Sequence, residues 1–316
     1  MASKKWTSEE VEYLKLNYGK QSAQELAEKF QVTKQAIVSK CYKLGISAKE
    51  NRGEIWSEEE NKIMYEHFEY APLNLIKELL PNRTMHAINQ HGNKELGLSR
   101  ISKDRYKLDY KFFEIWTPES AYIYGFISAD GYIKYEHGDR NENSLQFELA
   151  DYDADILYKI KDMLQYEGDV RHSKRNTVKF SIGNKKLIKD LIDKGMPKTN
   201  KTFEIKYPET LPDELFSHYL RGLFDGDGTI YYNDSKGLLF RLLGTESLLL
   251  EIQNKINEFC LDISNIHLQD RAPQGANVFA LSVSNKNSIK IFDFMYKDST
   301  IHLDRKYNKY LEYKNK

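Results

Sequence analysis

The sequence predicts an α+β protein in which an αββαββα unit occurs twice, preceded by two small all-α units of three helices each. The duplication is predicted from two stretches with the same pattern of glycines and acids: "IYGFISADG" (Ile123–Gly131) and "LRGLFDGDG" (Leu220–Gly228). The same run of expected helices and strands follows each stretch. The two all-α units are predicted from "WTSEE" at Trp6, which recurs as "WSEEE" at Trp56.

Composition excludes some classes of protein and leaves others open. The 316 residues carry 47 Lys and Arg against 47 Asp and Glu, so net charge neither supports nor excludes a nucleic-acid partner. No apolar run approaches the ~20 residues that span a bilayer, and "MASKKWTSEE" has no signal-peptide core. The two cysteines, Cys41 and Cys260, lie far apart, which fits a reducing compartment. We expect a cytoplasmic protein.

The first hundred residues form two copies, 1–50 and 51–100, and each is expected to contain three short helices. In the first copy "AQELAEKF", the break "QVT" and "KQAIVSKCYKLG" indicate two helices joined by a tight turn. In the second copy "PLNLIKELL", "PNRT" and "MHAINQHGNKELG" repeat this arrangement. Thr7, Ser8 and Ser57 are candidate N-caps, with glutamates in the first turn.

The tandem units resemble Myb/SANT-like helix-turn-helix modules over residues 5–100, which implies DNA binding. The third helix of each unit is rich in the side chains that contact phosphates and base edges in a major groove. The alternative is a pair of small bundles that bind protein or brace the chain. The candidate DNA contacts are Lys34, Gln35, Ser39, Lys40 and Lys43 in the first copy, and Arg83, His86, Asn89, Gln90, Asn93 and Lys94 in the second.

Residues 101–117 are rich in Lys and Arg and lack periodicity, so they are predicted to be a basic linker. An ordinary solvated connection is the alternative.

Residues 118–208 and 209–316 are expected to form the two αββαββα repeats. Apolar residues alternate with polar ones in segments such as "SLQFELA", which predicts sheets with one face covered by helices and one face open. The open faces are expected to be polar and partly basic. Their candidate DNA contacts are Lys134, Gln146, Arg171, Lys174, Arg175, Lys179, Arg241, His267, Gln269 and Arg271.

Glycines inside the first helix of each repeat point to a helix–helix contact. Each glycine costs about 1 kcal/mol relative to alanine in a helix, so a compensating role is expected. Small residues recur every four positions around Gly125 and Gly222, a spacing that lets two helix backbones approach closely. The two helices should therefore pack against each other across a pseudo-twofold axis and bring Asp130 and Asp227 side by side.

Two carboxylates at helix C-termini are unfavourable, because the helix end carries partial negative charge and the acids repel each other. A divalent cation relieves both effects, and paired carboxylates that hold hard cations are used in phosphodiester hydrolysis. A lone Asp-Gly is usually a turn. Here the pair recurs in the same context, with Asp227 97 residues after Asp130.

These two stretches resemble the paired motifs of single-chain LAGLIDADG homing endonucleases, over roughly residues 118–313. The resemblance implies two sheets that form a saddle over DNA, and Mg²⁺-dependent cutting of both strands of a long site, with Mn²⁺ as a substitute. It also implies that Asp130 and Asp227, with the backbone of Ala129 and Gly226, hold the metal. At the earlier acid position this sequence has Ser128 in one copy and Asp225 in the other, which puts symmetry in doubt.

The family also carries basic residues near the scissile phosphates, late in each repeat. "MPKTNKTF" and "STIHLDRKYNKYL" resemble those segments. The carry-over assigns catalytic roles to Lys201 and Lys306, with Lys198 and Arg305 as the second choices. The alternative is that these are ordinary surface lysines.

The sequence thus predicts a site-specific DNA endonuclease that acts as a monomer in the nucleoid, since the duplication supplies the twofold of a dimer. The rival prediction is a transcription regulator or RNA-splicing maturase on an inactive nuclease fold. Such proteins usually lose the motif acids, and both acids are present here.

Overall fold

A computed structural model describes residues 4–19, 21–46, 56–100, 106–134, 143–233, 237–260, 267–270 and 278–315. The chain divides into two compact units, Met1–Lys62 and Ile63–Lys316, and each is described by itself. Within the described ranges no helix has the length and apolar character needed to cross a membrane.

The first unit contains α1 (Ser8–Asn17), α2 (Ala23–Lys29) and α3 (Lys34–Lys43). Of the two candidate caps at the start of α1, Thr7 is the one used: its side chain accepts a hydrogen bond from the Glu10 amide, and the Glu10 carboxylate accepts one from the Thr7 amide. Such a reciprocal box satisfies amides that otherwise have no partner in the helix. Ser22 caps α2 in the same way.

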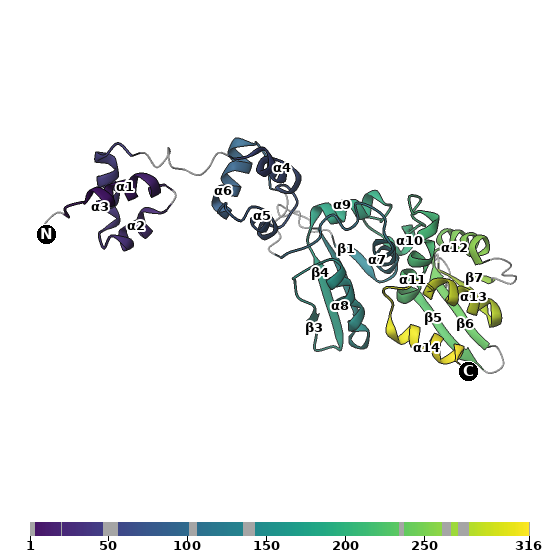
Figure 1. Ribbon diagram of the computed structural model, residues 1–316. Helices are drawn as coiled ribbons and strands as arrows, with labels where there is room; N and C mark the ends of the chain where they lie inside the picture. The colour runs from purple at the N-terminus through teal and green to yellow at the C-terminus, as the bar shows by residue number, and fades with distance from the viewer. Residues whose placement is uncertain are drawn as a thin grey trace. The chain divides into compact units, whose positions relative to one another are not determined.

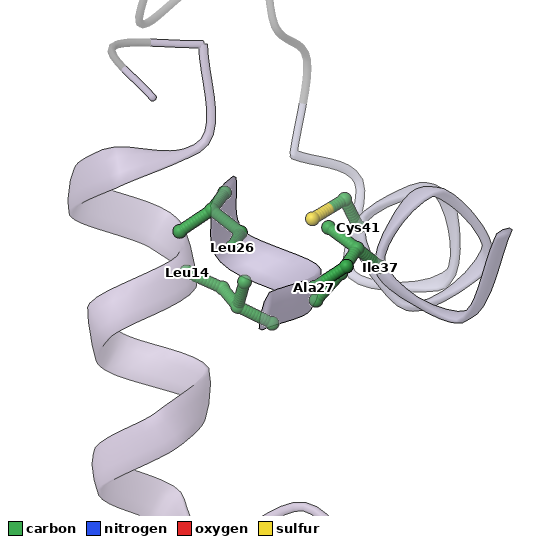
Figure 2. Close-up of a cluster of buried hydrophobic side chains, with 5 residues drawn as sticks. All are labelled: Leu14, Leu26, Ala27, Ile37 and Cys41. Atoms are coloured by element: carbon green, nitrogen blue, oxygen red, sulfur yellow. The ribbon is translucent and has the colours of Figure 1, made fainter. Parts of the chain in front are cut away.

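The core of this unit draws on all three helices. Figure 2 shows Leu14 of α1, Leu26 and Ala27 of α2, and Ile37 and Cys41 of α3 converging. Each is 2% exposed or less. Burial of these apolar side chains is the main source of stability for such short helices, which are marginal alone.

A second group of helices follows: α4 (Glu58–His67), α5 (Leu73–Leu79), α6 (Met85–Gln90) and the π-helix η1 (His91–Glu95). Ser57 caps α4 through a reciprocal box with Glu60. Phe68 and Ile88 are fully buried, and Gly92 is required because a Cβ there would lie 2.3 Å from the Phe68 ring.

The predicted basic linker needs correction where it is described, at residues 106–117. Leu108, Tyr110 and Phe113 are at most 3% exposed, so this segment is anchored by its apolar side chains. Its lysines face acids instead of remaining open: Lys107 pairs with Glu78 at 3.0 Å and Lys111 with Glu66 at 2.5 Å. The segment therefore joins the second helical group to the body of its unit.

Two four-stranded antiparallel sheets share one strand order. Figure 1 labels strands of both sheets, β1, β3 and β4 in one and β5, β6 and β7 in the other. The first sheet has the order β1-β2-β4-β3 and the second β5-β6-β8-β7. Buried Leu145 and Phe147 alternate with more open neighbours along β2, as expected for a sheet covered on one face. The strands are β1 (Gly131–Lys134), β2 (Ser144–Ala150), β3 (Arg171–His172), β4 (Thr177–Ile182), β5 (Gly228–Asn233), β6 (Gly237–Gly244), β7 (His267–Asp270) and β8 (Phe279–Ser284).

The helices interleave with these strands so that the order αββαββα occurs twice. In the first copy the helices are α7 (Pro118–Ala129), α8 (Ala154–Met163) and α9 (Lys185–Asp193). In the second they are α11 (Phe216–Asp227), α12 (Glu246–Cys260) and α13 (Asn285–Tyr296). Each copy is followed by a further helix, α10 (Lys201–Glu204) or α14 (Asp304–Lys314).

A buried arginine organises the inner side of α11. Arg221 has no exposed surface. Its Nε donates to the Ile301 carbonyl at 2.8 Å and its Nη1 to the Met295 carbonyl at 2.6 Å. Its Nη2 lies 3.0 Å from His218 Nδ1. Since guanidinium only donates, His218 Nδ1 acts as the acceptor, and the ring is neutral.

This pairing predicts acid sensitivity. Burial, and then the charge of Arg221, lowers the pKa of His218 from 6.5 to about 4. The unfolded chain takes up this proton near pH 6.5 and the folded chain only near pH 4. Stability is therefore complete above pH 6.5 and is lost as the pH falls towards 4, by about 1–3 kcal/mol. Urea unfolding of wild type and His218→Gln at pH 7 and pH 4.5 measures this, and equal pH dependence in the two proteins would contradict it.

Candidate functional site

The site is built on the contact between α7 and α11, whose backbones touch. A Cβ added at Gly125 would lie 2.2 Å from the Tyr219 carbonyl oxygen, and one added at Gly222 would lie 1.9 Å from the Tyr122 carbonyl oxygen. These distances leave no room for a side chain. The two glycines named from the sequence thus lie at the crossing of the helices.

The same contact brings the helix C-termini together. A Cβ at Gly226 would meet the Ala129 Cβ at 2.2 Å and Asp130 Oδ2 at 3.2 Å. Asp130 caps α7, and Asp227 is the last residue of α11. In the part of the chain that the structure describes, neither carboxylate makes a hydrogen bond or ion pair.

A lysine ammonium group lies under each helix end, where positive charge is favoured by the backbone dipoles. Lys201 Nζ donates to carbonyls at the end of α7, and Lys306 Nζ donates to the equivalent carbonyls at the end of α11. The Lys201 acceptors are Ile127 at 3.0 Å, Ala129, and Gly131 at 2.5 Å. The Lys306 acceptors are Phe224 at 2.7 Å, Gly226 at 3.3 Å and Gly228 at 2.6 Å, with Asp225 at 2.8 Å as a fourth.

The second choices from the sequence do not reach these positions. The Lys198 side chain is exposed. Arg305 points instead to Asp153, with two hydrogen bonds of 2.9 Å each. Geometry therefore favours Lys201 and Lys306.

The site disfavours the charged form of each of its two acids and two lysines. Loss of hydration at the crowded helix ends, and then the charge of Asp130, raises the pKa of Asp227 to about 6, although the residue as a whole is exposed. The same loss of hydration raises the pKa of Asp130. Burial lowers the pKa of both Lys201 and Lys306 to about 8.

This donor set fits a hard divalent cation. Within the described residues it offers two carboxylates that make no hydrogen bond or ion pair and whose ionised forms are disfavoured. The adjoining carbonyls of Ala129 and Gly226 each accept from a lysine and keep a second lone pair for a cation. The described residues contain no group of three or more His, Cys, Asp or Glu that could hold a metal ion. The chain thus supplies part of a coordination shell, as in Mg²⁺ sites completed by water and phosphate oxygens.

The two copies differ at the earlier acid position. Ser128 Oγ donates to the Tyr124 carbonyl of its own helix at 2.9 Å. Asp225 is 2% exposed, and its Oδ2 accepts from Tyr122 Oη and from the Leu303 amide, both at 2.8 Å. Burial raises the pKa of Asp225 to about 6.

The sheet residues named as DNA contacts lie mostly on open faces. Lys134, Arg171, Lys174, Arg175 and Lys179 are exposed. Lys179 pairs across the strands with Glu148 at 2.9 Å, so part of its charge is already compensated.

Gln146 and Arg241 are half-buried, and each is held by a hydrogen bond, to Tyr132 Oη at 2.8 Å and to Ser282 Oγ at 3.1 Å. The side chains of His267 and Gln269, and the whole of Arg271, lie outside the described residues.

Aromatic side chains on the same faces were missed in the sequence. Tyr132 is 41% exposed and lies one residue after Gly131 in β1, and Tyr231 is 55% exposed and lies three residues after Gly228 in β5. A pocket of about 560 Å³ opens beside Tyr132, with Gln146, Arg171 and Lys179 in its lining. Strand alternation after Gly131 and Gly228 was the signal that could have identified them.

Most of the residues named as DNA contacts on α3, and on α6 with η1, face solvent. Lys34, Gln35, Ser39 and Lys43 are exposed on α3, and Lys40 is half-buried. Tyr42, which was not named, is 87% exposed and follows Gln35 and Ser39 at helical spacing.

In the second copy His86, Asn93 and Lys94 are exposed, and Asn89 and Gln90 are half-buried. Arg83 is a correction: it is 9% exposed, because it lies in the turn that packs between α5 and α6, so it does not belong to the open face.

Comparison with known proteins places the motif region. Residues 123–207, which begin within α7 and end just after α10, match the family model described as LAGLIDADG endonuclease. The LAGLIDADG meganuclease I-AabMI bound to uncleaved DNA is 17% identical, covers 62% of this chain and 90% of its own, and gives a TM-score of 0.42. For meganuclease I-SmaMI bound to uncleaveable DNA the values are 14%, 63%, 89% and 0.44.

One curated protein also matches. The glutamine–fructose-6-phosphate aminotransferase (isomerizing) of Methanocaldococcus jannaschii is 27% identical over 207 residues, which are 63% of this chain and 18% of that protein. The chain thus spans less than a fifth of that relative, and the match gives no ground for aminotransferase activity.

Proposed function

We propose that this protein is a site-specific DNA endonuclease that cuts both strands of a long site with Mg²⁺, for which Mn²⁺ can substitute. One observation carries the proposal. Asp130 and Asp227 stand at the adjoining C-terminal ends of α7 and α11, close enough for the charge of Asp130 to raise the pKa of Asp227, and each helix end carries a lysine bonded to equivalent carbonyls. Asp130 and Lys201 lie in the region that matches the LAGLIDADG endonuclease model.

Asp130 and Asp227, with the carbonyls of Ala129 and Gly226, would hold the cation. Bound there, Mg²⁺ would supply Lewis-acid stabilisation of the charge that develops on phosphate oxygens. Lys201 and Lys306 would place positive charge beside the reacting phosphate or the attacking water. The lowered pKa of about 8 lets each lysine give up its proton near neutral pH, which suits a group that must orient or deprotonate water.

The open sheet faces, with Arg171 and the tyrosines Tyr132 and Tyr231, would seat the duplex. Because the unit is duplicated within the chain, one chain can bind two DNA half-sites, so we propose a monomer. The helical units would add contacts on one flank of the site through α3 and through α6 with η1.

Cleavage of a randomised duplex library tests the proposal without a known target. Linear products should form with Mg²⁺ or Mn²⁺ and be absent with EDTA, and sequencing of the ends should return one long site. The Asp130→Asn, Asp227→Asn double variant is the control for a contaminating nuclease. Bound but intact DNA under all metal conditions would identify a regulator or maturase instead.

The first helical unit gives a separate prediction. Deleting residues 1–50 removes α1–α3 and leaves the second unit, with its own core, intact. Each lost phosphate contact should reduce the slope of log K against log[salt] by about 0.9, so loss of Lys34, Lys40 and Lys43 should lower the slope by roughly 2–3. The footprint should shorten on one side only.

Full-length protein with Lys34→Ala and Lys43→Ala is the matched control, because it should lose part of the slope and keep its fold. An unchanged slope and footprint in the deletion would show that this unit does not touch DNA and serves as a brace or a protein-binding module.

A further inference from the structure

We propose that Asp225 is a positioning residue that fixes the segment 301–305, and through it Lys306, so that the lysine at the second helix end is held more firmly than Lys201 at the first. The inference deepens the proposed function and rests on it for one consequence: the two DNA strands are cut at unequal rates.

Asp225 connects three parts of the fold. It lies on α11, and its Oδ2 accepts from Tyr122 Oη of α7 at 2.8 Å and from the Leu303 amide, immediately before α14, at 2.8 Å. Its Oδ1 is buried and makes no hydrogen bond within the described residues. Ser128, the equivalent residue of the first copy, donates to the Tyr124 carbonyl of its own helix and interacts with the Tyr219 hydroxyl of α11. Within the described residues it makes no bond to the segment before Lys201, so at this position the tie to the lysine segment belongs to the second copy.

The residues on either side of Leu303 are held as well. Arg221 Nε donates to the Ile301 carbonyl at 2.8 Å. Lys159 of α8 donates to the His302 carbonyl at 3.1 Å and to Asp304 Oδ1 at 2.5 Å. The guanidinium of Arg305 binds both oxygens of Asp153, at 2.9 Å each.

Every residue from 301 to 305 thus has an anchor outside its own segment. Asp153 and Lys159 belong to the first αββαββα copy, so both copies fix the position of Lys306. Bonds to charged partners are stronger than neutral ones, and the bidentate Arg–carboxylate pair adds orientation.

The segment before Lys201 differs. The side chains of Lys198, Thr199 and Asn200 are exposed and make no hydrogen bond or ion pair in the part of the chain that the structure describes. Lys201 opens a helix of four residues, and Asn200 before it has a φ of 51°. The anchors lie further from the lysine: Tyr124 Oη of α7 donates to the Lys194 carbonyl at 3.1 Å, and Thr245 Oγ1 donates to the Ile205 carbonyl at 3.2 Å.

The segment that carries Lys306 is already ordered, so it loses little conformational entropy in the reaction. The segment that carries Lys201 is held less firmly and loses more conformational entropy when DNA binds. The strand that depends on Lys306 should therefore be cut first, and nicked duplex should accumulate before the double-strand break.

Strand-resolved cleavage of an end-labelled target, taken from the library selection, tests this. Lys306→Met and Lys201→Met identify which strand depends on which lysine. Asp225→Ser copies the first repeat into the second. It should slow the Lys306-dependent strand by about 10- to 100-fold and the other strand by less than about threefold. Ser217→Ala on the same helix as Asp225 is the control and should leave both strands within about threefold of wild type.

Equal slowing of both strands by Asp225→Ser, or slowing of the Lys201-dependent strand alone, would overturn the inference. A general loss of stability cannot imitate the expected result, because it lowers the amount of active protein for both strands alike.

Hydrogen exchange on the metal-free full chain gives a readout apart from cleavage. Asp225→Ser should speed exchange of the amides of 301–306 and leave those of 198–204 unchanged. Unchanged exchange at 301–306 would sink the inference even if the protein cuts DNA, whereas a wild type that cuts no DNA would sink the proposed function while exchange still decides the anchoring. If Asp225→Ser does not fold, Lys159→Met and Asp153→Asn loosen the same segment from its outer side and should slow the same strand.

Discussion

Asp130→Asn and Asp227→Asn should each slow DNA cutting by roughly 10³-fold or more, while the protein still binds its target. Asparagine keeps the shape of each side chain and removes the charge that would bind the cation. Because the two carboxylates stand at the adjoining ends of α7 and α11, loss of either one should disrupt a shared site.

Linearisation of target plasmid in Mg²⁺ measures the loss, and binding in Ca²⁺ shows that the DNA surface is intact. Neither variant should melt at a lower temperature, since each replaces an acid whose charged form is disfavoured there. Asp162→Asn, at an exposed acid on α8, is the control and should cut at the wild-type rate. Full Mg²⁺ activity in both motif variants would end the metal hypothesis.

Gly222→Ala should destabilise the fold by about 1–3 kcal/mol or more, although alanine is the better helix former by about 1 kcal/mol. The added Cβ would lie 1.9 Å from the Tyr122 carbonyl oxygen and 2.9 Å from the Phe126 amide nitrogen. Both are backbone atoms of α7, so no side-chain rotation relieves the clash, and the helices must separate. Gly222→Leu should be worse still.

Thermal and urea unfolding measure the loss. Separation of the helices should also displace Asp227 from Asp130, so cutting should fall in the fraction that remains folded. Ser217→Ala on the same helix is the matched control and should change stability by less than about 0.5 kcal/mol. An unchanged melting temperature in Gly222→Ala would mean that the helices do not meet at this glycine.

The fold was largely predictable because its signals are local. Strand alternation, capping residues such as Thr7 and Ser57, and each copy of the glycine and acid pattern are read over a few neighbouring positions. The same signals failed where packing overrides composition. Residues 106–117 are rich in basic side chains, yet Leu108, Tyr110 and Phe113 bury themselves, and Arg83 is drawn inward despite its charge.

The sequence by itself determined that two helices with small-residue stripes should meet and bring Asp130 and Asp227 together, because a glycine at helical spacing has meaning only as a close backbone contact. Only the tertiary structure decided which basic residues reach that point. Lys201 bonds to carbonyls some 74 residues away and Lys306 to ones some 82 residues away, whereas their near neighbours Lys198 and Arg305 do not. Contacts at that separation depend on how loops return to the helix ends, which no local pattern encodes. The sequence shows that Ser128 and Asp225 differ. That Asp225 holds the segment before Lys306 follows only from the position of the Leu303 amide in the structure.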